Sequence, residues 1–238
     1  MTKEDFKTRL ETSLQDTAEQ LPPDDIDRLL SQAVLLYSKT KPCEKIHELT
    51  GDGVAYDFVL PTGWVEGFSS IVGLIEYPAD DSQSPAYIGS SDWQFFRKLV
   101  VTVTTTYLRF TTFIPENGKK VRFPYTIPHV LSDTSNTISD YDIEAVVSLA
   151  ASLCFWSLAA KFAQTSDSTI SADVIDYQRK SDTYSALAKE KLSLYNALMG
   201  IGSSEKASLV ASAGTVVKEF DVVFPWGEDY LTHPSRER

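Results

Sequence analysis

Cysteine and basic side chains are both scarce in this sequence. Its 238 residues include only two cysteines, Cys43 and Cys154, which are too few for a disulfide framework and indicate an environment where no crosslink is needed. The 22 Lys and Arg residues face 33 Asp and Glu residues, which leaves a formal net charge of −11. A protein that coats duplex DNA needs a cationic excess. The charge therefore excludes that class and leaves open a surface past which DNA slides.

Long apolar runs are also missing. The N-terminal residues hold no apolar stretch long enough for a signal peptide, so we expect no targeting segment. The longest uncharged run, residues 145–160, has about 16 residues where a membrane span needs about 20. Acidic residues precede this run in place of a basic flank. It therefore predicts a buried core helix and a protein that does not interact with a membrane.

The common catalytic motifs are absent as well. The three histidines, His47, His129 and His233, match no zinc-binding spacing. The sequence contains neither a P-loop nor a nucleophile elbow, and Gly51-Asp52-Gly53 lacks the third glycine of a dinucleotide loop. We therefore expect a protein that is not an enzyme and that needs no cofactor or metal ion.

Two groups of side chains leave other functions open. Asp80, Asp81 and Asp92 can act as paired carboxylates in a hydrolase or hold a cation, although a solvated acidic loop is commoner. A set of aromatic residues, together with the polar loop 79–91, can form a sugar-stacking platform in a virion protein that binds carbohydrate or a receptor. In a β-domain such residues more often belong to the core. The set is Trp64, Phe68, Trp93, Phe95 and Phe96.

The first 42 residues have the pattern of two helices. Phe6, Leu10 and Leu14 form one apolar stripe at a spacing of four residues. Pro22 and Pro23 then interrupt the pattern, and a second helix with a broad apolar face is expected from Pro23 to about Lys41.

Residues 43–130 have the sequence pattern of a β-domain. Short runs of β-branched and aromatic residues alternate with turn signals, which predicts a small sandwich or barrel. We expect hairpin turns at Gly51-Asp52-Gly53 and at Asn117-Gly118. The run from Leu99 to Phe110 predicts a single strand.

Helical patterns return in residues 131–202. One helix is expected from Ser139 to about Thr165, and another from about Ser171 to Gly200. Two long helices joined by a short connection predict an antiparallel hairpin. We therefore predict an α+β fold: a helical bundle from 1–42 and 131–202 with a β-domain, 43–130, inserted into it.

Residues 203–238 form a predicted extended C-terminal arm. The middle of the arm is apolar although no segment of the chain remains to pair with it, so we expect it to dock on a partner rather than fold back on its own core. The apolar residues concerned are Val222, Val223, Phe224, Trp226, Tyr230 and Leu231.

This arrangement of segments resembles the head-to-tail connector adaptors of tailed bacteriophages, the neck proteins that bind beneath the portal. The second helix (DDIDRLLSQAVLLYSKTKP), the strand entry LPTGWVEGFSSIVGLIEYP and the segment DIEAVVSLAASLCFWSLAAKF followed by DVIDYQRKSDTYSALAKEKLSLY carry the resemblance. The simplest adaptors are shorter and wholly helical. The β-domain departs from them, and we expect it to face outward or toward the tail.

The resemblance implies a structural virion protein that is assembled in the host cytoplasm. Such a protein forms a ring with copies of itself, usually twelve, continues the DNA channel for genome ejection and receives the next tail component. Its partners would be the portal protein, which the arm would bind, the next neck or tail protein, and double-stranded DNA that passes without specific binding. Acidic side chains would line the channel and repel phosphate. The candidates are Asp140, Asp142, Glu144, Asp173, Asp176 and Asp182.

Overall fold

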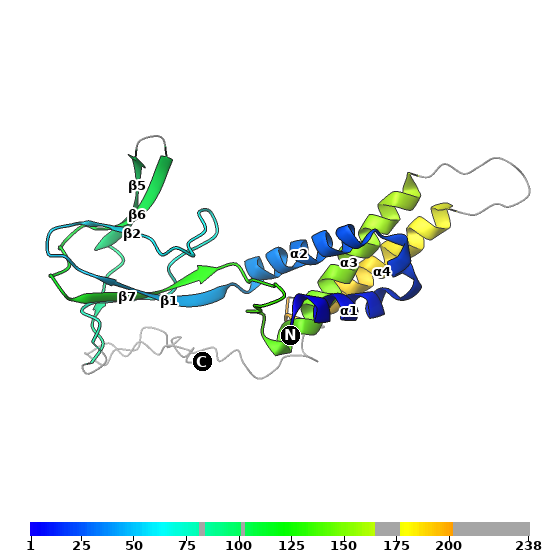
Figure 1. Cartoon of the computed structure of the whole chain (residues 1–238), viewed down its shortest axis with the longest axis horizontal. Helices are drawn as coiled ribbons and strands as arrows, with labels where there is room; N and C mark the ends of the chain where they lie inside the picture. Colours follow the sequence, from blue (N-terminus) through cyan, green and yellow to red (C-terminus); the bar gives the residue numbers. More distant parts are fainter. Residues whose placement is uncertain (81–83, 101–102, 165–176, 202–238) are drawn as a thin grey trace, which may run out of the picture.

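The protein combines α-helices with two antiparallel sheets in a computed structural model that describes residues 1–80, 84–100, 103–164 and 177–201. The helices and the sheets form two parts that lie end to end (Figure 1). The helical elements are α1 (Lys3–Leu14), η1 (Gln15–Gln20), α2 (Pro23–Thr40), η2 (Asp140–Asp142), α3 (Ile143–Ala163) and α4 (Tyr177–Leu198). The strands are β1 (Cys43–Thr50), β2 (Asp57–Val59), β3 (Ile75–Glu76), β4 (Tyr87–Ile88), β5 (Trp93–Val100), β6 (Val103–Phe110) and β7 (Lys120–Ile127).

The two N-terminal helices form as their sequence predicts. A capping box between Thr2 and Asp5 begins α1: the Asp5 backbone N–H donates to the Thr2 hydroxyl, and the Thr2 N–H donates to the Asp5 carboxylate. The predicted stripe of Phe6, Leu10 and Leu14 is buried. The second helix begins at Pro23, where the missing N–H of proline costs no helical hydrogen bond.

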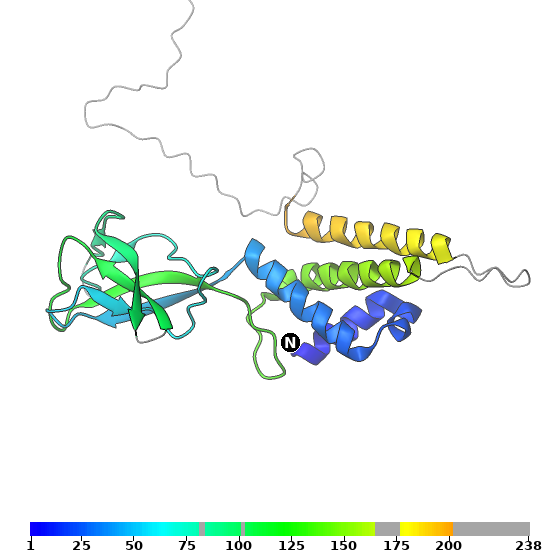
Figure 2. The same ribbon diagram turned by 90° about the horizontal axis from the view of Figure 1, so that it is seen from above.

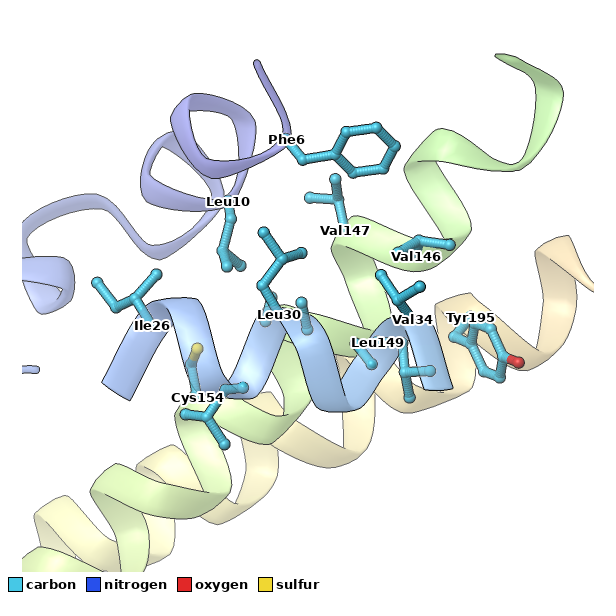
Figure 3. Packing of buried hydrophobic residues seen from close by; sticks show 14 of the residues in the cluster. Phe6, Leu10, Ile26, Leu30, Val34, Val146, Val147, Leu149, Cys154 and Tyr195 are labelled. Atoms are coloured by element: carbon cyan, nitrogen blue, oxygen red, sulfur yellow. The ribbon is translucent and has the colours of Figure 1, made fainter. Parts of the chain in front are cut away.

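Helix α3 is the centre of the helical part. It packs against α1, α2 and α4, and so most of its positions are buried (Figures 2 and 3). In the described part of the chain, Asp140–Ala163 is the one helical stretch with the length and apolarity of a membrane span. Since 72% of its apolar window is buried inside the structure, it has the character of a core helix.

Helices α3 and α4 run antiparallel along each other. The Ser152 hydroxyl on α3 donates to the Ala188 carbonyl on α4 over 2.8 Å, and Ser181 donates to the carbonyl of Ala159 over 2.9 Å. The residue numbers rise along one helix as they fall along the other, which fixes the antiparallel direction. The connection between the two helices lies outside the described residues.

The β part consists of two sheets. One has the strand order β1-β7-β3-β4 and the other β2-β6-β5, and all their pairs are antiparallel. Buried side chains from β3, β6 and β7 belong to one cluster, so both sheets contribute to the same core. In the described residues the two sheets do not join into a closed barrel, which removes the barrel from the predicted alternatives.

Three local strand predictions are wrong. The predicted hairpin at Asn117-Gly118 does not join β6 to β7, because β6 pairs with β2 and β5 whereas β7 pairs with β1 and β3. The predicted hairpin at Gly51–Gly53 does not join neighbouring strands, because β1 pairs with β7, from Cys43 opposite Ile127 to Thr50 opposite Lys120. The predicted single strand from Leu99 to Phe110 is instead the end of β5 followed by β6. These two strands pair with each other from Trp93 opposite Phe110 to Val100 opposite Val103. Both strands lie within a run of Val and Thr residues that contains no Gly or Pro, so the sequence does not mark where β5 ends and β6 begins.

The buried side chains form two separate clusters. The first joins α1, α2, α3 and α4, and the second lies between the sheets. The domain boundaries predicted at residues 42 and 130 stay predictions, and the predicted arm, 203–238, lies outside the described residues.

Substitution on α2 tests the helical core. Leu30 is fully buried in the first cluster, so Leu30→Ala should lower the free energy of unfolding by about 2–5 kcal/mol through lost contacts and a cavity. Leu35 lies on the same helix but is 56% exposed, and Leu35→Ala should change stability by no more than about 0.5 kcal/mol. Urea unfolding of both variants measures the difference. Equal losses would contradict this packing.

Candidate functional site

The chain crosses between its helical part and its β part twice, at one place. Helix α2 ends at Thr40 and β1 begins at Cys43, while β7 ends at Ile127 and leads back through residues 128–139 to η2 and α3 (Figure 1). Polar side chains gather where these crossings meet. This junction cluster consists of Tyr37, Ser38, Lys41, His129, Thr137 and Asp142.

The Asp142 carboxylate is the charged centre of the junction cluster. It accepts a hydrogen bond of 2.7 Å from the Tyr37 hydroxyl and one of 2.6 Å from the Lys41 ammonium group, and its side chain is only 13% exposed. Burial by itself raises the pKa of this carboxyl, but the bonds from Lys41 and Tyr37 outweigh burial and hold the pKa below its ordinary value. The pair thus ties the end of α2 to the start of α3.

Tyr37 belongs to both the core and the junction cluster. Its ring is fully buried in the helical core, while its hydroxyl reaches Asp142. Burial, followed by the neighbouring Asp142 carboxylate, raises the pKa of the phenol far above its ordinary value, so the group remains a hydrogen-bond donor.

His129 links the two crossings from the other side. Its backbone N–H donates to the Ser38 hydroxyl over 2.9 Å. Its ring lies between two backbone carbonyls, with Nε2 2.9 Å from the oxygen of Lys41 and Nδ1 3.0 Å from that of Thr137. The same ring packs against Tyr37, with 4.9 Å between centroids. One imidazole therefore connects the start of β1, the return segment and the helical core.

The junction cluster has a structural role. Its charged and polar groups are all hydrogen-bonded to one another, and the described contacts place no nucleophile beside a base oriented by a third group. No group of three metal-ligating side chains occurs in the described part of the chain either.

The described members of the predicted channel acids differ in their surroundings. Asp140 and Asp182 are exposed, while Glu144 is exposed and pairs with Arg9. Asp142 is the charge of the junction cluster. Asp173 and Asp176 lie outside the described residues, as do the predicted arm residues Val222, Val223, Phe224, Trp226, Tyr230 and Leu231. That these acids line a channel stays a prediction.

An apolar groove lies on the outer face of the four-stranded sheet. It has a volume of about 350 Å³. Ile46, whose side chain is 71% exposed, lies at one side, and Leu74 and Tyr87 are also exposed. Ion pairs link neighbouring strands beside the groove. Arg122 on β7 contacts Glu48 on β1 and Glu76 on β3, and Lys120 on β7 also contacts Glu48. The groove is lined by Ile46, Val72, Leu74, Tyr87 and Pro124, with Glu76 and Arg122.

The aromatic residues considered as a sugar platform pack mostly on one another. Trp64 stacks with Tyr125 at 6.1 Å between centroids and lies 5.3 Å from Phe95, which also contacts Trp93. Phe96 is covered by the guanidinium of Arg109, 3.5 Å from its ring centroid. Since these rings contact protein groups, the geometry favours their role in packing over the stacking platform.

The acids of the hydrolase alternative do not form a described pair. The Asp92 carboxylate accepts hydrogen bonds from the Gly89 N–H and the Thr112 hydroxyl, which is the role of a loop-fixing residue. Asp80 is exposed, and Asp81 lies outside the described residues.

Comparison with known proteins gives little. No protein-family model matches the chain, and no curated protein matches it. Among solved structures, a chain from the "Neck of native GTA particle computed with C12 symmetry" matches with a TM-score of 0.27 and 13% identity, covering 75% of this chain and 89% of that one. A TM-score this low does not show a shared fold and assigns no function to this chain.

Sequence reasoning missed both the junction cluster and the groove. Four members of the cluster lie at the end of α2 or just after β7, where they have the usual composition of a helix end and a loop. A lysine at the end of α2 and an acid at the start of α3 each look like ordinary dipole partners. Only knowledge that the two ends meet would have paired them.

The pH dependence of stability tests the Asp142 contact. Because the folded-state pKa of Asp142 is below its ordinary value of 3.8, its stabilisation is present above that value and is lost as the pH falls through the folded-state pKa. Asp142→Asn should therefore cost about 1–3 kcal/mol near neutral pH, and the gap to wild type should shrink below about pH 4. Chemical unfolding across pH measures it.

Glu144→Gln is the matched control for this experiment. Glu144 lies two residues away, and its pair with Arg9 is exposed, so its loss should change stability by no more than about 0.5 kcal/mol. A gap for Asp142→Asn that is as small as the control, or that does not vary with pH, would show that the contact contributes no stability.

Proposed function

We propose that this chain is a structural component of a phage-like virion neck, an adaptor that forms a ring beneath the portal. The ring, for which the resemblance implies twelve copies, continues the DNA channel and provides the docking platform for the next tail component. The proposal includes assembly in the host cytoplasm and no enzymatic activity. It places the portal protein, neighbouring copies and the next neck protein as partners.

The exposed apolar surface carries this proposal. Ile46, Leu74 and Tyr87 gather around the groove on the sheet, and Tyr141, beside the start of α3, is 97% exposed. Exposed apolar residues that line one groove mark a site of protein–protein contact, and Tyr141 is a separate exposed residue in η2. This exposed apolar surface supports an assembly protein more directly than a lone soluble domain.

The arrangement of the two parts suits a ring. Contacts between unlike faces of identical subunits close into a ring when each contact rotates the next copy by a fixed angle. That rotation is reproducible only if each subunit is stiff. The antiparallel contact of α3 with α4 and the junction cluster both supply stiffness.

The charge suits a passage for DNA that does not grip it. With a net charge of −11, the chain repels phosphate over most orientations. Asp140, Glu144 and Asp182 are the exposed members of the predicted channel set. Asp142 adds less to such a field because its charge is balanced by Lys41.

The predicted arm is the proposed anchor on the portal or on a neighbouring copy. Its apolar side chains would fill pockets on that partner and contribute most of the binding energy, as buried aromatic anchors do at interfaces. These are Val222, Val223, Phe224, Trp226, Tyr230 and Leu231.

Truncation after Gly202 tests the anchor. Both buried clusters are built from residues before this point, so the shortened chain should stay folded and soluble. It should no longer join the portal, which native mass measurement of the mixture with portal would show. Truncation after Thr232 is the control, since it removes only the last polar residues and should bind as the full chain does. Normal assembly of the shorter form would remove the arm as anchor.

A further inference from the structure

Strand β1 has one open edge. Among the described residues it pairs with β7 alone, and it stands at the end of the sheet order β1-β7-β3-β4. Over its eight residues, Cys43–Thr50, the outer row of backbone N–H and C=O groups has no described strand partner. Such an edge is a template for an added strand.

The edge adjoins the apolar groove. Ile46 lies in the middle of β1, points to the outer face of the sheet opposite Pro124, and is one of the lining residues of the groove. A strand added along this edge would cover both the unpaired backbone and the exposed Ile46 side chain. Main-chain bonds would supply affinity, and alternate side chains would supply specificity.

The C-terminal arm contains a segment with strand character. Residues 216–224 read VVKEFDVVF and are rich in β-branched and aromatic residues. Phe220, Val222 and Phe224 fall on one face at a period of two, while Glu219 and Asp221 fall on the other. Its nine residues match the eight-residue length of the open edge.

We propose that residues 216–224 of a neighbouring copy add to the open edge of β1 as an antiparallel strand, with Phe220 opposite Ile46. In this register Asp221 lies opposite Lys45 and Lys218 opposite Glu48, two pairs of opposite charge. Val217 lies opposite Leu49 and Val223 opposite Cys43, which are apolar pairs on the inner face. This inference rests on the proposed ring, since it supplies the contact between copies.

Neighbouring registers fit less well. A shift of two residues either way puts a charged side chain opposite Ile46 or Leu49 and keeps at most one pair of opposite charge. The parallel arrangement with Phe220 opposite Ile46 also gives two pairs of opposite charge, Glu219 with Lys45 and Lys218 with Glu44, so charge alone does not choose the direction. Every described pair in this sheet is antiparallel, and antiparallel pairing is slightly the more stable per residue, which favours the antiparallel strand.

The neighbouring copy is the source that fits a ring. The end of α4 lies near the start of β1, since the Tyr195 hydroxyl is 3.2 Å from the Thr40 hydroxyl at the end of α2, so the proposed ring, and not reach, selects the neighbouring copy over the same copy. An arm from one copy on the edge of the next joins two different surfaces, which is the heterologous contact that a closed ring requires.

A disulfide with the native Cys43 tests this register in the full chain. Val223→Cys should link to Cys43 on oxidation with diamide and give covalent dimers and larger species on a non-reducing gel. Cys154 should not interfere, because burial raises the pKa of its thiol to about 12. Val222→Cys, with its side chain on the opposite face, is the matched control and should link roughly tenfold less or not at all.

Three further results would overturn the inference. Linking of Val217→Cys in place of Val223→Cys would show a parallel strand. Links within single chains only, identified by mass spectrometry of the monomer band, would show that the arm comes from the same copy. Equal linking of Val223→Cys and Val222→Cys would show that no strand forms.

The native mass before oxidation separates this inference from the proposed function. If the protein forms a ring but Val223→Cys links no more than Val222→Cys, the added strand is wrong while the proposed ring is still supported. If the protein forms covalent dimers but no ring, the added strand is supported and the proposed ring is contradicted.

Discussion

The ion pair between Asp142 and Lys41 is the constraint on which the arrangement of the molecule depends. Because the β part is inserted between α2 and α3, the chain must leave the helices and return to them at the same place. The Asp142 carboxylate connects the two chain crossings there. It accepts hydrogen bonds from the Lys41 ammonium group at 2.6 Å and from the hydroxyl of the buried Tyr37 at 2.7 Å. Loss of Lys41 would leave this largely buried carboxylate with the Tyr37 hydroxyl as a donor but without an opposite charge, which proteins tolerate poorly. The contact holds the end of α2, from which β1 continues, against the start of α3.

The sequence predicts the helices well because their signal is local. Phe6, Leu10 and Leu14 form a stripe that needs only one core, and α3 is apolar on nearly every side because three helices surround it. The prediction of the strands fails for a different reason. Alternation predicts which side of a strand is buried, but it carries no information about the partner. The Gly118 N–H donates to the Gly51 carbonyl, and β1 pairs with a strand whose residues are 70 to 84 positions away.

The site could not be predicted for the same reason. Lys41 and Asp142 are 101 residues apart, and each alone looks like a favourable charge at a helix end. Asp142 was accordingly grouped with the acids of a channel wall, although its carboxylate is mostly buried and paired. Ile46 shares its face of β1 with Glu44 and Glu48, and the sequence alone gives no sign that this face lines an open groove. Long-range pairing is the information that a single sequence lacks.

The charges along β1 explain how an open edge can be kept without aggregation. Glu44, Lys45 and Glu48 interrupt the edge, and a random apolar strand would meet at least one charge without a partner. The proposed strand places opposite charges at Lys45 and Glu48, leaves only Glu44 without an opposite charge, and gains the exposed Ile46 as an apolar contact. Selectivity then arises because mismatched strands are rejected, while main-chain hydrogen bonds along the edge supply the affinity. An edge built this way is suited to a single kind of partner, as an ordered assembly requires.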